Sequence, residues 1–425
     1  KRISMSKKIK VLTLSDHPLS PSGVGTQTKY VCEALLKSGK FEIISLGGAI
    51  KHQDYRTMKV DPYGDEWRII PVDGYGTQEM IRSVLRTEKP DILWFMTDPR
   101  FYAWLWDMEN EIRPLIPMVY YHVWDNFPAP MFNRKFYLSN DRICAISKVT
   151  RDIVAEVAPE IKLDYVPHAV DNEIFKPLTD EKIINLRKEN LKIEDQEKVV
   201  FFWNNRNARR KQSGSLIFWF KKFLDEVGHD KAQLIMHTDP KDPHGQDLLH
   251  IVEHLGLDTQ QQVLFSTQKV GQGDLAAMYN MVDCTINISD AEGFGLATLE
   301  SLSCGTPIIA NMTGGLQEQV ALGSNATGIA LIPESKAVIG SQDVPYIYED
   351  RLSEAQVVNA LKKMMALGRE GRKEMGHNGR EFVIKNYSLE VFNKQWVDIM
   401  TEVYEEEGSW DTRTNYQGIR FLEVA

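Results

Sequence analysis

Seven residues separate Glu292 from Glu300, and two glycines, Gly293 and Gly295, follow the first glutamate. Glycines in these positions allow a tight turn in which the backbone comes close to a ligand. Carboxylates on either side of such a turn can accept hydrogen bonds from hydroxyl groups, while the amides between them hold a diphosphate. This is the chemistry that a nucleotide-sugar requires.

The residues around this turn predict the elements that position it. An apolar, strand-like run, Cys284–Ile288, precedes the turn, and residues 296–303 have the pattern of a helix that Gly305 and Pro307 close. Free backbone amides and the helix dipole both favour an anion at a helix N-terminus. Strand, glycine turn and helix therefore predict a phosphate site. The alternative is an ordinary loop-to-helix turn that carries two solvated glutamates.

The whole string resembles a known family signature. Glu292 and Glu300 with Gly293-Phe294-Gly295 between them, then Cys304-Gly305-Thr306-Pro307, closely resemble the E-x7-E signature of retaining GT-B glycosyltransferases of family 4, the glycosyl transferases group 1. The resemblance implies an α/β chain with two Rossmann-like, doubly wound domains that face a central cleft, and a C-terminal helix that crosses back to the first domain. It implies that Glu300 holds the ribose hydroxyls, that Glu292 contacts the sugar, and that Gly293, Phe294, Gly295 and Leu296 bind the donor.

A second set of site residues lies in a basic turn. Residues 198–203 predict a strand, and the segment that follows, up to the helix expected at 215–227, contains Arg206 and Lys211. A planar guanidinium fork and a point charge after a strand suit a diphosphate, whereas the alternative is a solvated basic loop. The resemblance places Arg206 and Lys211 on the donor's diphosphate, although Gln212 stands where the family commonly has glycine.

The chain begins with a similar strand–turn–helix pattern. Residues 9–15 predict a strand, 26–38 an amphipathic helix and 41–46 a second strand, an order that implies a parallel sheet covered by helices. The turn contains Gly23 but not a complete G-x-G-x-x-G dinucleotide motif. In the resembled family paired glycines here face the donor phosphates; because Ser22 replaces the first, Gly23 is the candidate.

Three further positions have expected roles. His122 follows a predicted strand and is either a hydrogen-bonded core histidine or, as the resemblance implies, a residue that contacts the donor sugar. Thr267 and Val270 lie where the family's backbone frames the nucleotide base, so they are candidates for the base site.

The domain boundaries follow from these patterns and from the resemblance. We expect an acceptor-binding Rossmann-like domain at 5–176, a nucleotide-sugar-binding Rossmann-like domain at 177–388, and a crossover helix and polar tail at 389–425 that pack on the first domain. Residues 337–351 predict no definite structure.

Composition limits the partners. The formal net charge is −9, and nucleic acid is therefore an unfavoured though not an excluded partner, because phosphate backbones need a basic footprint. The four cysteines are scattered without C-x-x-C spacing, which predicts reduced core residues in a cytoplasmic protein. No apolar run approaches the about 18 residues that span a bilayer. There is no Asp-x-Asp motif, and we expect neither a metal nor another cofactor.

The sequence thus predicts a retaining, metal-independent hexosyltransferase that moves a sugar from a nucleoside-diphosphate sugar, UDP-linked rather than GDP-linked, to a hydroxyl of a carbohydrate, lipid or other acceptor. A nucleotide-sugar epimerase and a non-catalytic nucleotide-sugar-binding protein are the alternatives. A more remote one is an NAD-dependent oxidoreductase that uses the turn at Gly23, which would leave Arg206, Lys211 and Glu300 without a role.

Overall fold

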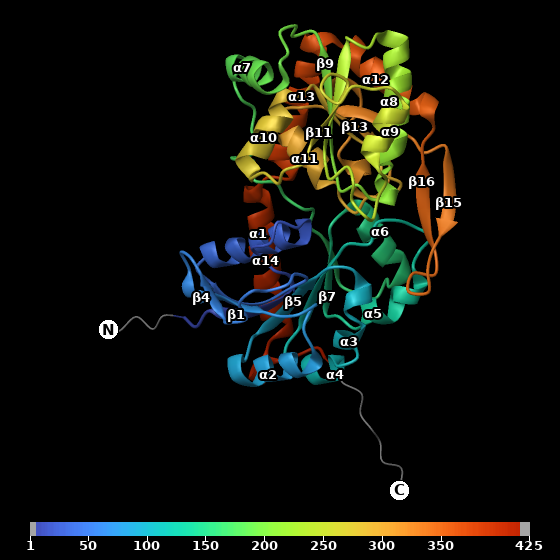
Figure 1. Cartoon of the computed structure of the whole chain (residues 1–425). Helices are drawn as coiled ribbons and strands as arrows, with labels where there is room; N and C mark the ends of the chain where they lie inside the picture. The colour runs from blue at the N-terminus through green and yellow to red at the C-terminus, as the bar shows by residue number, and fades with distance from the viewer. Residues whose placement is uncertain (1–5, 417–425) are drawn as a thin grey trace. The chain divides into compact units, whose positions relative to one another are not determined.

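The computed structural model describes residues 6–416 and divides into two compact α/β units (Figure 1). Unit 1 contains the described residues up to Ala169 and those from Leu389 onward, and unit 2 is Val170–Ser388. The division lies before 170–176, whereas the sequence predicts a first domain at 5–176. These residues belong to unit 2 because the Val170 amide donates to the Tyr387 carbonyl (3.1 Å) and Ser303 Oγ donates to the Phe175 carbonyl (2.6 Å).

Unit 1 is built on an eight-stranded sheet in the order β3-β4-β2-β1-β5-β6-β7-β8. All neighbouring strands are parallel except β3 and β4, which are antiparallel. The strands are β1 (Ile9–Asp16), β2 (Phe41–Gly48), β3 (Met58–Val60), β4 (Gly64–Pro71), β5 (Ile92–Met96), β6 (Met118–His122), β7 (Arg142–Ala145) and β8 (Leu163–Tyr165).

Helices cover both faces of this sheet. Because the connection from β1 to β2 runs opposite to those from β4 through to β8, right-handed crossovers place α1 on one face and the later helices on the other. The last helix, α14, packs beside α1 (Figure 1), with Trp396 against Trp94 of the sheet (ring centroids 5.9 Å apart). The helices are α1 (Gly23–Lys37), α2 (Gln78–Glu88), α3 (Ala103–Trp106), α4 (Glu109–Ile112), α5 (Arg134–Leu138), α6 (Lys148–Val157) and α14 (Leu389–Glu407).

The chain after α14 is held on unit 1 rather than extended as a polar tail. Trp410 donates its indole N–H to the Pro90 carbonyl (2.9 Å), and Arg413, which is almost fully buried, pairs with Asp141 (2.7 Å). These contacts fix the described residues 408–416, and the remainder of the expected tail, 417–425, lies outside the described residues.

Unit 2 has a six-stranded parallel sheet in the order β11-β10-β9-β12-β13-β14. From β9 the chain moves outward in one direction through β10 to β11, and from β12 it moves in the other. The strand order therefore reverses between β9 and β12. The strands are β9 (Val199–Asn204), β10 (Ala232–His237), β11 (Val263–Ser266), β12 (Cys284–Asn287), β13 (Ile308–Asn311) and β14 (Gly328–Leu331).

The two directions of crossover sort the helices of unit 2 into two layers. Helices α8 and α9 cover one face and α12 packs on α8, while α10 and α11 cover the other face, where α7 packs on α10 and α13 on α11. The helices are α7 (Asp180–Leu191), α8 (Ser213–Val227), α9 (Leu248–His254), α10 (Gln272–Met281), α11 (Leu296–Ser303), α12 (Glu354–Ala366) and α13 (Gly368–Asn386).

The segment for which the sequence predicted no definite structure contains an antiparallel hairpin, β15 (Ser335–Ile339) with β16 (Ile347–Arg351), which lies beside the unit 2 sheet (orange in Figure 1).

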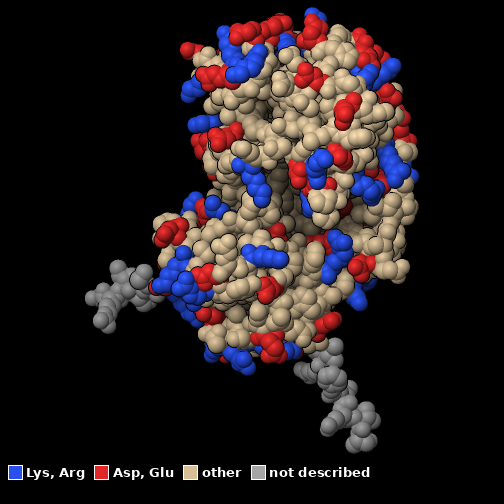
Figure 2. All heavy atoms as spheres, viewed as in Figure 1, with Lys and Arg blue, Asp and Glu red and all other residues tan. Residues whose placement is uncertain are grey.

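The distribution of charged residues and cysteines can be compared with what the composition predicts. On the face shown in Figure 2, Lys and Arg alternate with Asp and Glu over each unit. All four cysteines are free and buried, as expected. Within residues 6–416, no helix is long and apolar enough to cross a membrane.

Candidate functional site

The candidate site lies at the C-terminal ends of β9 and β12, where the strand order of unit 2 reverses. Open α/β sheets bind ligands at such a reversal because the two neighbouring loops turn away from each other and leave a crevice. Asn204 ends β9 and Asn287 ends β12. The basic turn follows the first strand and the glycine turn follows the second, so the fold brings these two segments of the sequence together.

The centre of the site is an ion pair between Lys211 and Glu292. Lys211 ends a short 3-10 helix, Arg209–Lys211, and its Nζ donates to Glu292 Oε2. Asn287 Nδ2 donates to the same oxygen (3.2 Å). The two charged side chains are only 10% and 12% exposed. A pair shielded in this way interacts more strongly than one at the surface.

The charge of Glu292 is maintained despite its surroundings. Burial raises the pKa of its carboxyl, but the nearby charges of Lys211 and Arg210, with hydrogen bonds from Lys211 and Asn287, outweigh burial and lower the pKa below its usual value. Glu292 is therefore a carboxylate at neutral pH, an acceptor for hydroxyl groups.

The glycine turn ends at the N-terminus of α11. Gly295 has a φ of +91°, and a Cβ on it would lie 2.4 Å from Leu316 Cδ2, so both backbone and packing require glycine there. Gly293 lacks this backbone conformation. Among the described residues no side chain caps α11, so the amides of its first turn have no intrahelical acceptor. These amides can donate to an anion, and the anion site itself stays a prediction.

Glu300 is the fifth residue of α11 and lies in an environment that differs from that of Glu292. Tyr279 donates its hydroxyl to Glu300 Oε1 (3.3 Å), and Asn204 Nδ2 donates to the Tyr279 hydroxyl (2.9 Å). Burial of the carboxyl raises the pKa of Glu300 to about 8. At neutral pH Glu300 is therefore mainly protonated, unlike Glu292.

The arginines of the basic turn point to different partners. Arg206 is 61% exposed and pairs with Asp242 (2.9 Å) rather than approaching Glu292. The guanidinium near Glu292 is that of Arg210, whose Nη1 donates to the Ala291 carbonyl (2.7 Å). The sequence analysis did not single out Arg210. A run of adjacent arginines does not show which one faces inward, because the 3-10 turn decides it.

The hairpin adds acidic residues that the sequence analysis also missed. Glu349 of β16 is almost fully buried and pairs with Arg209 (2.6 Å). The Asp350 amide donates to the Asp290 carbonyl (2.8 Å), and Gln212 Nε2 donates to Asp290 Oδ2 (2.7 Å). The hairpin is thereby tied to the two segments that carry Lys211 and Glu292.

Comparison with known families decides what this unit is. Residues 184–382, which contain both segments of the site, match the family described as Glycosyl transferases group 1. This segment of unit 2 therefore resembles the glycosyl transferases group 1 family. N-acetyl-alpha-D-glucosaminyl L-malate synthase of Bacillus anthracis is 22% identical over 279 residues, 65% of this chain and 65% of that protein. The chain thus covers just under two thirds of the length of this curated relative.

Solved structures extend the likeness to almost the whole chain. Sucrose-phosphate synthase from Thermosynechococcus elongatus superposes with a TM-score of 0.73 at 17% identity, covering 94% of this chain and 100% of that one. Anabaena HepE in complex with UDP gives a TM-score of 0.68 at 13% identity, covering 93% and 100%. These likenesses show the fold, and the expected GT-B fold is confirmed.

The remaining expected donor residues of unit 2 lie at the edge of its sheet. Thr267 and Val270 are exposed and follow β11, the edge strand, whose neighbour β10 separates it from β9. They are at the same end of the sheet as Lys211 and Glu292. Their role at the nucleotide base stays a prediction.

Two expected site residues belong to unit 1. Gly23 is the first residue of α1, which begins earlier than predicted because Ser22 Oγ accepts from the Gly25 amide (3.0 Å) and caps the helix. His122 ends β6, is fully buried and shares a hydrogen bond of 2.5 Å with the Tyr137 hydroxyl. Burial lowers the pKa of His122 to about 3, so the ring is neutral. Its expected contact with the sugar stays a prediction.

Within residues 6–416, no three His, Cys, Asp or Glu side chains are grouped so that they could hold a metal ion. The cations near Glu292 are instead the side chains of Lys211 and Arg210.

Proposed function

We propose that this protein is a retaining glycosyltransferase that moves a hexose from a nucleoside-diphosphate sugar, preferentially UDP-linked, to an acceptor hydroxyl. The observation that carries the proposal is the Lys211–Glu292 pair beside the uncapped N-terminus of α11, at the reversal of the strand order. This arrangement places a cation and free amides next to a carboxylate, which suits a diphosphate attached to a hydroxyl-rich sugar.

Charge stabilisation is the main catalytic effect in this proposal. When the bond between the sugar and the diphosphate breaks, negative charge accumulates on the leaving phosphate. Lys211 and the first-turn amides of α11 are held in place before the reaction, so they stabilise that charge without reorganising. Glu292 accepts hydrogen bonds from the sugar, and Glu300 from the ribose.

The same residues account for catalysis without a metal ion. In a transferase that uses Lys211, Arg210 and the helix N-terminus, these groups supply the positive potential that a divalent cation otherwise gives. We expect full activity after treatment with EDTA. A loss of activity that Mg²⁺ or Mn²⁺ restores would contradict this part of the proposal.

Thermal shifts with UDP, GDP, ADP and NAD test the binding part. A ligand present at 100 times its Kd stabilises the folded protein by about 2.7 kcal/mol. We expect UDP to give the largest shift and Lys211→Ala to abolish it. Lys222→Ala is the matched control, because it removes a lysine that is 53% exposed on α8 of the same unit. Stabilisation by NAD alone would overturn the proposal.

Turnover distinguishes an enzyme from a protein that only binds the nucleotide-sugar. With UDP-hexose and a panel of carbohydrate and lipid acceptors, we expect UDP release that depends on the acceptor, and a product whose NMR coupling constant shows the donor's anomeric configuration. Inverted product would reject the retaining mechanism. Binding of UDP-hexose without transfer to any acceptor would favour the non-catalytic alternative.

A further inference from the structure

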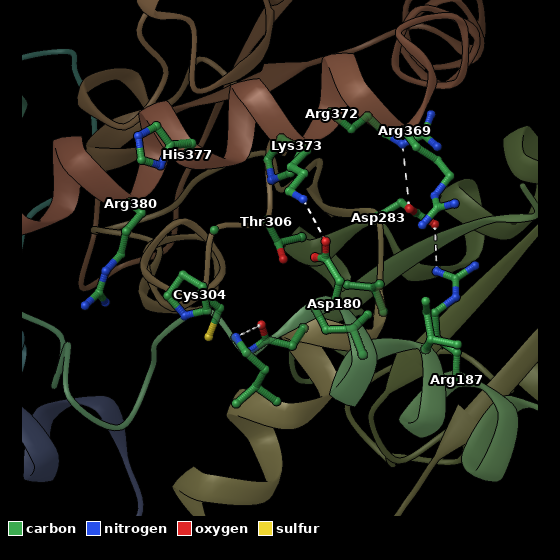
Figure 3. A pocket seen from close by; sticks show the side chains of 18 of the residues that line it. Asp180, Arg187, Asp283, Cys304, Thr306, Arg369, Arg372, Lys373, His377 and Arg380 are labelled. Carbon is green, nitrogen blue, oxygen red and sulfur yellow. Dashed lines mark hydrogen bonds and ion pairs between the residues drawn. The ribbon is translucent and has the colours of Figure 1, made fainter. Parts of the chain in front are cut away.

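A second pocket lies in unit 2, lined by α7, α13 and the turn that follows α11 (Figure 3). Its volume of about 330 Å³ falls within the range of small-molecule sites, about 300–1,000 Å³. The candidate donor site is at the N-terminal end of α11, whereas Cys304, Gly305 and Thr306 at its C-terminal end line this pocket. The eight residues of α11 separate the two sites by about 12 Å.

One face of α13 supplies most of the positive charge. Arg369, Arg372, Lys373, His377 and Arg380 all line the pocket and are three or four residues apart or adjacent, so they lie along one side of the helix. Figure 3 shows these side chains on the α13 ribbon that borders the pocket.

The buried wall of the pocket carries more positive than negative charge. Arg187 and Arg372 are 4% and 5% exposed, and both pair with a single carboxylate, Asp283, at 3.1 and 3.7 Å. The Nε atoms of both arginines are buried without a hydrogen-bond partner within residues 6–416, and Arg372 Nε reaches Asp283 only as an ion pair at 3.7 Å. Buried polar groups left unpaired cost free energy, and an anion in the pocket reduces that cost.

Arg380 also lines the pocket, and only some of its guanidinium N–H groups donate hydrogen bonds within the protein. Its Nη1 donates to the carbonyls of Asn172, Phe175 and Ser303, and among the described residues its Nε and Nη2 donate to no protein acceptor. Burial lowers the pKa of the Arg380 guanidinium, which shows that the charge is poorly solvated.

The acidic residues of the lining do not close the site to anions. Asp283 is already shared by two arginines, and Asp180 pairs with Lys373 (2.8 Å) across exposed side chains. Surface pairs of this kind are weak, so Lys373 can exchange Asp180 for a ligand. Glu370 lies beside Lys373, and among the described residues the exposed Arg369 pairs with Glu197 alone, at 3.8 Å.

We propose that this pocket binds the phosphate ester of a small hydroxyl-rich molecule, such as a sugar monophosphate. Arg369, Arg372 and Lys373 lie within about one helical turn and surround the phosphate. The apolar side chains of Ile183 and Ile184 contact the carbon skeleton, and Thr306 and Arg380 contact its hydroxyl groups. This site is independent of the proposed donor site.

The experiment is a calorimetric titration of the whole chain with glucose 6-phosphate, with inorganic phosphate and with glucose, which measures the affinity for each. The test variant is Arg369→Ala/Lys373→Ala, whose side chains are 48% and 63% exposed, so that folding should be preserved. The matched control is Lys222→Ala/Lys241→Ala, which removes two exposed cations of the same unit outside the pocket.

We expect the ester to bind the wild type and the control equally, and at least ten-fold more weakly to the test variant. Hydrogen exchange should show protection in α7 and α13 rather than in residues 289–300. Equal binding to test variant and control, absence of binding, or protection only at 289–300 would overturn the proposal. Equal affinity for inorganic phosphate and the ester would overturn the assignment to an ester. None of these outcomes depends on whether the protein transfers sugar.

Discussion

At the scale of single residues, Lys211 and Glu292 give the most direct prediction. Removing one member of a buried ion pair leaves the other charge unpaired, so we expect Lys211→Met or Glu292→Gln to destabilise the chain by about 3 kcal/mol. The double variant should lose less than the sum, because neither charge is then left alone. Urea unfolding of the four proteins measures the coupling.

The same variants separate structure from catalysis. If Lys211 stabilises the leaving diphosphate, Lys211→Met reduces kcat about 100- to 1,000-fold. Adding Glu292→Gln to this variant should recover part of the lost stability but none of the lost kcat. Recovery of both stability and activity in the double variant would mean that Lys211 serves only to neutralise Glu292.

Glu300 predicts a dependence of stability on pH. Its pKa is about 8 in the folded protein, against about 4.3 in an unfolded chain, so between these values the folded state holds a proton that the unfolded state has lost. The free energy of unfolding therefore falls as pH rises from about 4 to 8. Glu300→Gln removes this dependence and should raise Tm at pH 8 but not at pH 4. Melting curves across this range, compared with Glu390→Gln on α14, provide the measurement.

Binding provides the second half of this test. If the Glu300 carboxylate accepts hydrogen bonds from the ribose hydroxyls, nucleotide binding favours its ionised form, and calorimetry in buffers of different ionisation enthalpy should detect release of a proton at pH 7. Proton uptake, or no exchange of protons, would contradict the role of Glu300 at the ribose.

At the scale of elements, the turn before α11 depends on Gly295. Alanine would have to adopt a φ near +91° and would meet Leu316, so we expect Gly295→Ala to destabilise the chain by about 1–3 kcal/mol and to weaken UDP binding. Gly273→Ala on α10 is the matched control, since nothing lies within 4 Å of the added Cβ. Thermal unfolding with and without UDP measures both effects, and equal behaviour of the two variants would remove the special role of Gly295.

Sequence reasoning predicted elements well where they carried clear end signals. The helix at 296–303 was placed correctly because glycines lie at both its ends. The start of α1 was predicted too late because Ser22 was interpreted as a replaced glycine rather than as a helix cap. The β15–β16 hairpin was missed because its exposed, mixed side chains give no alternating pattern, and its anchor, the pairing of Glu349 with Arg209, joins residues far apart in the sequence.

Which residues would meet in the site was predicted only in part. Lys211 and Glu292 were both singled out, and the fold joins them at the reversal of the strand order. Arg206 was singled out because the resembled family has Arg and Lys at this spacing. In the structure Arg206 pairs with Asp242 and Arg210 donates to the Ala291 carbonyl, so the role of Arg206 at the diphosphate stays a prediction. Glu300 was singled out for the ribose, a role that stays a prediction, whereas the burial that raises its pKa cannot be read from spacing.

At the scale of the whole molecule, the GT-B fold was predicted from the family resemblance, but the division at Ala169 was not. Residues 170–175 resemble a linker in composition, yet their backbone hydrogen bonds go to Tyr387 and Ser303. Partners distant in the sequence, rather than local patterns, decide where a compact unit begins.

The candidate donor residues that lie within unit 2 predict which part of the chain responds to a nucleotide. Lys211, Glu292, Glu300 and the first turn of α11 belong to Val170–Ser388, so UDP alone should slow hydrogen exchange at 204–212 and 289–300 while leaving β1 and α1 unchanged. Backbone amides that donate hydrogen bonds to a bound ligand exchange their hydrogens more slowly, so the amides at the binding site should show the largest protection. Glu292→Gln should retain this pattern at higher UDP concentration, whereas protection confined to the turn at Gly23 would place the nucleotide in unit 1 and favour the dinucleotide alternative.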